Sequence, residues 1–178
     1  QILGLVHREM LDLGDGDLAN TQERRAAVVA VIRRLRPRLV LTNALDGRHP
    51  DHRRAHELVR DAVFLANVGG FPAEGERWQV EGVGWPAIAV HQPDPRADWV
   101  VDVTETWPTK IAALQAYASQ IHADPGDPNP TYISSPDFWE QIERRARLWG
   151  HLIGTELAEP FLLDRPAHAG HPLVRLIL

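Results

Sequence analysis

Two histidines and an aspartate lie together in the segment Arg48-His49-Pro50-Asp51-His52. Imidazole and carboxylate groups hold catalytic metal ions and move protons beside them. With Pro50 as the first helical residue, His49 stands at the cap and Asp51 in the first turn, where the positive helix end favours a carboxylate. Asp51 can accept a hydrogen bond from a ring nitrogen of His49, which would fix the tautomer of that ring. His52 is then free to give a ring nitrogen to a metal ion.

A purely structural explanation of the same segment stays open. A His-x-x-His spacing occurs by chance, and Pro-Asp is a common way to open a helix. Asp46 and Arg48 in the same loop weigh against this explanation, because a solvated surface loop does not need so many titratable groups. The loop is therefore a candidate metal or catalytic site.

The elements around this loop predict how it is positioned. The apolar run 39–42 predicts a buried strand, and the residues from Pro50 onward alternate at helical spacing. A helix capped by Asn20 or Thr21 is predicted to run to about Leu35, because Pro37 stops it. The order helix, strand, loop, helix is typical of a parallel α/β sheet. In such sheets ligands bind at the strand ends, where the loop lies.

The rest of the chain is predicted to continue the α/β pattern. Strands are expected at 6–13, 87–91, 99–103 and 173–178, with helices from about 104 to 122 and from Pro136 to about 153. Residues 67–84 and the tail from Glu159 are expected to be irregular. The loop 122–136 is rich in Pro, Gly and Asp, and loops of this length are often functional.

Other titratable residues allow two explanations each. His56 lies four residues after His52, on the same face of the helix. It is either a further metal ligand or a residue paired with a neighbour. His91 ends a predicted strand and is either a pocket residue or structural. The run 33–38 suits phosphate binding or, more commonly, a helix C-terminus that complements its dipole. The run 144–147 is predicted to be a solvated helix face.

The composition excludes several classes of protein. The 178 residues suit a single domain, 1–178, and the net charge of −5 argues against general nucleic-acid binding. The sequence has no cysteine, which excludes disulfides, thiolate metal sites and a cysteine nucleophile and fits a cytoplasmic location. It has no membrane-spanning apolar run, no signal peptide, no P-loop and no G-x-S-x-G elbow.

The histidine segment also supports a family resemblance. The sequence RHPDH followed by RRAHELVRDAVFLA resembles the PIG-L/LmbE family of zinc-dependent N-acetylglucosaminyl deacetylases. Four segments, in order, are similar to the family's bacillithiol-pathway members, which act on N-acetylglucosaminyl-malate: REMLDLGDG, VIRRLRPRLVLTNALDGRHPDH, DWVVDVTETWPTKIAALQAYASQ and RARLWGHLIGTELAEPF. The resemblance covers most of the chain. It implies a Rossmann-like three-layer α/β fold with a mostly parallel sheet, one Zn²⁺ per active site and assembly into a homo-oligomer.

The resemblance implies a role for each residue of the motif. His52 corresponds to the zinc-ligand histidine, and His49 to the histidine that stabilises the oxyanion and shuttles a proton. Asp51 corresponds to the carboxylate that orients His49. Arg48 matches the arginine before the motif, whose bidentate geometry suits a substrate carboxylate.

The chain departs from the family at its start. The family opens with a strand that ends in an A-H-P-D-D type motif, which supplies the other zinc histidine, the zinc aspartate and the general-base aspartate. Nothing here matches that motif, so we expect the chain to begin after those strand-helix units, with two expected zinc ligands not in it. Three explanations stay open: the segment is missing from this chain, another chain supplies it, or this form is inactive.

The expected function is removal of the acetyl group from an N-acetylglucosaminyl conjugate, with N-acetylglucosaminyl-L-malate as the first substrate. The small-molecule substrate implies neither a nucleic-acid nor a membrane partner. One alternative is a deacetylase that acts on a chitobiose or inositol conjugate. The other is a non-catalytic α/β module that binds a sugar or serves in assembly.

Overall fold

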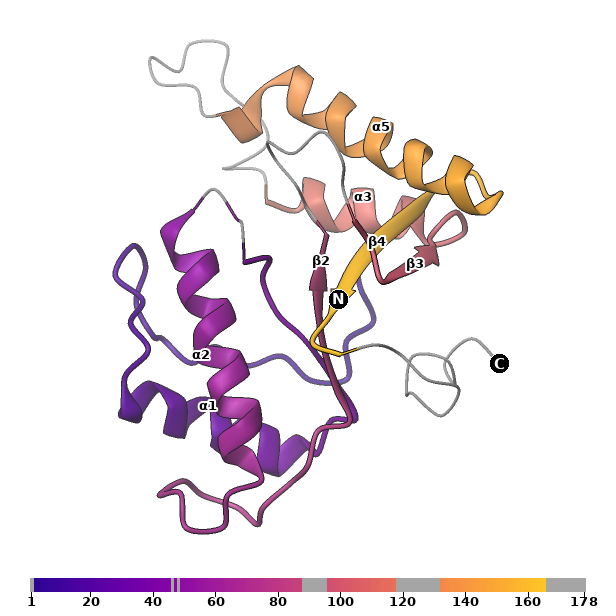
Figure 1. Ribbon diagram of the computed structural model, residues 1–178. Helices are drawn as coiled ribbons and strands as arrows, with labels where there is room; N and C mark the ends of the chain where they lie inside the picture. Colours follow the sequence, from indigo (N-terminus) through magenta and orange to yellow (C-terminus); the bar gives the residue numbers. More distant parts are fainter. Residues whose placement is uncertain (1, 46, 48, 88–95, 118–131, 166–178) are drawn as a thin grey trace. The chain divides into compact units, whose positions relative to one another are not determined.

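The computed structural model describes residues 2–45, 47, 49–87, 96–117 and 132–165. Its elements in chain order are α1 (Gln22–Leu35), β1 (Leu39–Leu41), α2 (Pro50–Ala66), β2 (Gly82–Pro86), β3 (Trp99–Asp102), α3 (Trp107–Gln115), the short 3₁₀ helix η1 (Tyr132–Ser134), α5 (Pro136–Ile153) and β4 (Ala158–Leu163). The strands form a sheet in the order β1-β2-β4-β3. Figure 1 shows these elements along the chain.

The predicted α/β class is confirmed, but the sheet is mixed rather than mostly parallel. Strands β1 and β2 pair in parallel, whereas β2 and β4 pair antiparallel. Antiparallel strands are common in otherwise parallel α/β sheets, because a strand that enters from the opposite end forms equally complete hydrogen bonds.

The chain divides into two compact units. The motif unit comprises residues 10–99 and 160–178, and the second unit comprises residues 1–9 and 100–159. All the residues of the predicted site belong to the motif unit, so that unit is the one that positions them.

Local sequence explains where the helices of the motif unit begin and end. Thr21 caps α1 by accepting a hydrogen bond at Oγ1 from the N–H of Arg24 at 3.3 Å. Arg36 ends α1 in a left-handed conformation, with φ of 50°, directly before Pro37. His49 caps α2 and Pro50 is its first residue, as the sequence predicts.

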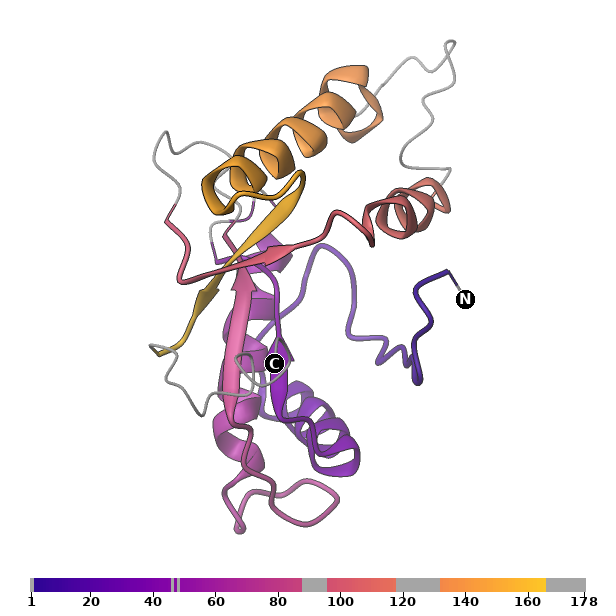
Figure 2. The same ribbon diagram turned by 90° about the vertical axis from the view of Figure 1, so that its right-hand side faces the viewer.

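The core of the motif unit lies between these two helices. Val29 and Ile32 of α1 meet Ala62 and Ala66 of α2, together with Val80. Figures 1 and 2 show α1 and α2 side by side, next to β1 and β2. Partly buried Val40 of β1 packs on the same cluster. This apolar packing fixes β1 against α2, and so fixes both ends of the loop that joins them.

In the second unit, α5 is followed by a tight return of the chain into β4. Ser135 caps α5 through Oγ, and Gly154 ends it with φ of 77°. A Cβ at Gly150 would lie 2.6 Å from the carbonyl oxygen of Glu156, so only glycine allows this close approach.

Several predicted elements differ in the structure. The segment 6–13 forms no strand, and its side chains are mostly exposed, with no strand paired to it in the described part of the chain. Strand β2 lies before the predicted strand 87–91, most of which is outside the described residues, as is the predicted strand 173–178. Strand β4 lies in the tail predicted to be irregular. Its three residue pairs with β2 begin at Phe161, so they do not need the N–H that Pro160 lacks.

The described helices include none that is both long and apolar enough to cross a membrane.

Arg33 joins α1 to the end of α2 and to the loop beyond it. The side chain is 3% exposed, and its guanidinium donates to four backbone carbonyls: those of Ala66, Val68, Ala73 and Gly75, at 2.7 to 3.3 Å. Ala66 and Val68 lie at the C-terminal end of α2, where the helix dipole favours a cation. The sequence suggested that Arg33 complements the dipole of its own helix, α1. In the structure it complements the dipole of the neighbouring helix α2.

We predict that Arg33→Met lowers the free energy of unfolding by about 2–4 kcal/mol, because buried carbonyls then lose their donors. Arg33→Lys should lose part of this amount, since an ammonium cannot reproduce the fork of the guanidinium. Urea denaturation measures both changes. Arg34→Lys, at an exposed position of the same helix, is the control and should stay within about 0.5 kcal/mol of the wild type. An Arg33→Met variant as stable as the control would contradict the assignment.

Candidate active site

The loop from β1 to α2 brings His49 and His52 together. Beyond the end of β1, the N–H of Thr42 still donates to Gly84 of β2 at 2.9 Å. The two imidazole rings are exposed, with their centroids 5.5 Å apart and their planes tilted by 38°. Asp46 and Arg48 lie outside the described residues, so the substrate-binding role of Arg48 stays a prediction.

His49 is held by the helix that it caps. Its Nδ1 accepts a hydrogen bond from the backbone N–H of Asp51 at 3.2 Å. A neutral imidazole carries one proton, so Nδ1 as the acceptor leaves the proton on Nε2. The cap thus sets the tautomer of His49 and presents a ring N–H in an exposed position.

The carboxylate of Asp51 has other partners than the one predicted from the sequence. It accepts hydrogen bonds from the backbone N–H of Gly16 at 2.5 Å, from that of Leu18 at 3.2 Å and from Arg54 at 3.2 Å. Asp51 therefore contacts the ring of His49 through its backbone N–H, while its carboxylate joins residues 14–18 to the first turn of α2.

These contacts also set the charge of Asp51. Burial acts to raise the pKa of this carboxyl group. The hydrogen bonds from Gly16, Leu18 and Arg54, together with the charge of His49, outweigh burial and lower the pKa below its ordinary value. Asp51 is thus held as an anion.

Sequence reasoning missed the contact that residues 14–18 make with Asp51. Gly14 and Gly16 have φ of 93° and 82°, which favours glycine. At Gly14 an added Cβ would also collide with Oδ1 of Asp17. The two glycines predict the turn, but nothing in the sequence shows that it docks on Asp51, which is 35 residues away from Gly16.

The side chain of His52 lies against the backbone of Gly47. A Cβ added at Gly47 would lie 2.8 Å from Cβ of His52 and 3.0 Å from its Nδ1. A larger residue at position 47 would therefore displace the His52 side chain.

His56 shows the paired arrangement of its two predicted alternatives. It is 2% exposed, and its Nδ1 lies 2.9 Å from the carbonyl oxygen of Asn43. The ring forms a T-shaped contact with Trp85, with centroids 4.7 Å apart and planes at 82°. Nε2 is buried and has no hydrogen-bond partner within the described residues.

The described residues do not by themselves complete a metal site. The imidazole of His52 is chemically suited to be one ligand of zinc. Within the described ranges, however, no three His, Cys, Asp or Glu side chains come close enough to hold a metal ion.

Two further histidines belong to the second unit. His7 pairs with Glu9 at 3.0 Å, and His151 lies in the last turn of α5. His91 and the loop 122–131 are outside the described residues.

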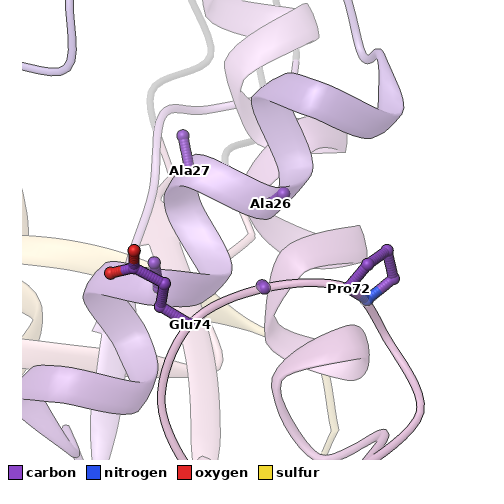
Figure 3. Close-up of a pocket in the computed structure, with 6 residues that line it drawn as sticks. Ala26, Ala27, Pro72 and Glu74 are labelled. Atoms are coloured by element: carbon purple, nitrogen blue, oxygen red, sulfur yellow. The ribbon is translucent and has the colours of Figure 1, made fainter.

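An open groove between α1 and residues 72–74 is a different feature of the motif unit (Figure 3). It is lined by Ala26, Ala27, Ala30, Pro72, Ala73 and Glu74. Apart from one carboxylate, these side chains offer no group for catalysis.

Comparison with known proteins places this geometry in a family. The sequence pattern of the family described as "PIG-L: GlcNAc-PI de-N-acetylase" matches residues 1–63, which include the whole histidine segment.

Three curated relatives are identical to this chain at about a third of the aligned positions. A 1D-myo-inositol 2-acetamido-2-deoxy-alpha-D-glucopyranoside deacetylase of Rhodococcus jostii is 31% identical over 70% of this chain and 51% of its own length. A diacetylchitobiose deacetylase of Thermococcus kodakarensis is 30% identical over 89% and 57%, respectively. A 4-oxalmesaconate hydratase of Pseudomonas putida is 33% identical over 68% and 48%. The chain thus spans about half the length of these relatives.

One solved structure matches a larger share of both chains than these three relatives do. The crystal structure of a conserved protein from Thermus thermophilus superposes with a TM-score of 0.81 and 33% sequence identity. The match covers 94% of this chain and 70% of that one. With the His49–His52 motif in place, these similarities show that the chain belongs to the PIG-L family.

Proposed function

We propose that the protein removes the acetyl group from an N-acetylglucosaminyl conjugate in a zinc-dependent reaction. The observation that carries the proposal is the histidine pair at the start of α2, where His49 has a fixed tautomer and His52 lies beside it. Membership of the PIG-L family supports it, as do two relatives that are deacetylases of acetamido sugars.

Each residue of the pair has a distinct task in this proposal. His49 donates from Nε2 to the carbonyl oxygen on which negative charge develops. His52 is a zinc ligand, with further ligands that the described residues do not supply. A bound zinc ion supplies Lewis-acid chemistry to amide hydrolysis. Asp51 holds residues 14–18 in place and orients His49 through the capping bond.

Three conjugates compete as the substrate. N-acetylglucosaminyl-L-malate is our first choice, because the segments quoted above resemble those of enzymes that act on it and Arg48 suits its carboxylates. An inositol conjugate and diacetylchitobiose are the alternatives that the names of two relatives support.

The hydratase among the relatives supports a second candidate function. Addition of water to an unsaturated acid also develops negative charge on an oxygen, so the same ring N–H would serve it. Release of acetate distinguishes the two reactions, because a hydratase forms none.

We predict that the complete gene product, loaded with zinc, releases acetate and a free amine from one of the three conjugates, and that His52→Ala loses zinc binding and activity together. Coupled acetate detection and zinc titration measure the two effects. Arg53→Ala, next in the chain and exposed, is the control and should keep both. A folded, zinc-loaded wild type that releases no acetate but hydrates 4-oxalmesaconate would replace the proposal by the second candidate. Failure to bind zinc would favour the non-catalytic module.

We predict that His49→Asn lowers kcat by about 10²–10³-fold, which is the usual effect of removing one oxyanion donor. Asparagine is among the best residues for capping a helix, so α2 and the zinc affinity should be kept while the distal N–H is lost. Steady-state kinetics and thermal melting separate the two roles. Turnover equal to that of the wild type would remove His49 from the reaction.

The lowered pKa of Asp51 predicts how stability depends on pH. Its carboxylate stabilises the folded state fully above the pKa of the unfolded chain, and this contribution is lost as the pH falls through the lower pKa of the folded state. The difference in unfolding free energy between the wild type and Asp51→Asn should therefore be constant between about pH 6 and 8 and shrink below about pH 4. Urea denaturation across this range measures it. Asp15→Asn, at an exposed position of the same turn, is the matched control. A pH-independent effect of Asp51→Asn would contradict the ionic role.

A further inference from the structure

We infer that His56 is a positioning residue for the active-site loop, held between Asn43 at the start of that loop and Trp85 of β2. The inference rests on the proposed function for its consequence, but its geometry does not depend on zinc. The carbonyl oxygen of Asn43 lies 2.9 Å from Nδ1 of His56, and Asn43 is the second residue after β1. Helix α2 thereby binds the loop that leads into its own N-terminus.

The bond requires one tautomer of His56. A carbonyl oxygen only accepts hydrogen bonds, so Nδ1 must carry the proton and Nε2 the lone pair. In His49 the backbone N–H of Asp51 donates to Nδ1, so the proton there is on Nε2. In their neutral forms, the rings of His49 and His56 would therefore hold opposite tautomers.

The contacts around His56 make the bond a rigid link. The ring is 2% exposed and forms a T-shaped contact with Trp85, over which the guanidinium of Arg60 lies at 5.9 Å from the ring centroid. A buried ring in contact with a second aromatic ring has little rotational freedom. The carbonyl of Asn43 is therefore held against a fixed point of the α2–β2 packing.

The link matters for His52 because α2 holds the loop at two places. His56 binds Asn43 at the start of the loop, and His52, one turn earlier on the helix, lies against the backbone of Gly47 near its end. Loss of the first contact would free the backbone that restricts the ring of His52. A zinc ligand whose orientation is less restricted binds the metal more weakly.

The first test reads the tautomer directly. Long-range ¹H–¹⁵N correlation spectra of the histidine rings should show His56 as the Nδ1–H tautomer, with slow exchange of that proton, and His49 as the Nε2–H tautomer. An Nε2–H pattern for His56, or rapid exchange of its ring proton, would overturn the inference.

The second test uses two substitutions at position 56 and one matched control, in the complete gene product. His56→Asn places a side-chain N–H close to the position of Nδ1, whereas His56→Phe keeps the ring volume and loses the donor. We expect zinc to bind about tenfold more weakly to the Phe variant, and close to wild-type affinity in the Asn variant. Leu58→Ala, at a 2% exposed position of the same helix, should lower the melting temperature without this loss of affinity.

The outcomes separate this inference from the proposed function. Equal zinc affinity in the wild type and His56→Phe would overturn the inference, as would an equal loss in Leu58→Ala, which would indicate a general effect of stability. A wild type that binds no zinc would reject the proposed function instead. Amide hydrogen exchange at Asn43 and Gly47, faster in His56→Phe than in His56→Asn, then decides the role of His56 without metal. If His56→Phe does not fold, the ring tautomer and the Asn variant give the decision.

Discussion

The capping bond from the N–H of Asp51 to Nδ1 of His49 is the interaction on which the site depends. The first N–H groups of a helix need acceptors outside it, and here an imidazole supplies one of them. One hydrogen bond therefore ends the loop, starts α2 and fixes the tautomer of His49. The same atoms satisfy the backbone and direct the ring N–H, so no second hydrogen bond is needed to fix the tautomer of His49.

The sequence predicted what depends on neighbouring residues. Pro50 at the first helical position and Thr21 as a cap act within one turn, and both are found where expected. The run 39–42 forms a strand at 39–41, but that strand is not buried as predicted, because its residues are partly buried or exposed. Strand β2 was predicted too late because Gly82 and Gly84 are typical of a loop. Gly84 is required for a different reason: a Cβ there would lie 3.2 Å from Leu41 on one side and from Leu162 on the other. That constraint comes from strands β1 and β4, which the local sequence does not show.

The long-range polar contacts also could not be predicted from the sequence. Arg33 and Asp51 are both charged residues whose partners are mainly backbone groups 33 to 42 positions away. Backbone carbonyls and N–H groups are present at every residue, so no residue type marks the partner. A buried Arg33 looks like any basic residue near a helix end until the end of α2 is in place beside it. The same holds for His56, whose acceptor is the carbonyl of Asn43.

The arrangement at the start of α2 specifies how negative charge on an oxygen could be stabilised, but it does not specify a single reaction. An imidazole N–H of fixed tautomer stabilises negative charge on an oxygen, whether that charge arises from water attacking an amide or from water adding to an unsaturated acid. Both reactions occur among the relatives by name. What selects between them must contact the rest of the substrate, as Arg48 is proposed to do. The proposed role of His49 is thus the charge stabilisation that both reactions need, and the choice of substrate is proposed to depend on the groups around it.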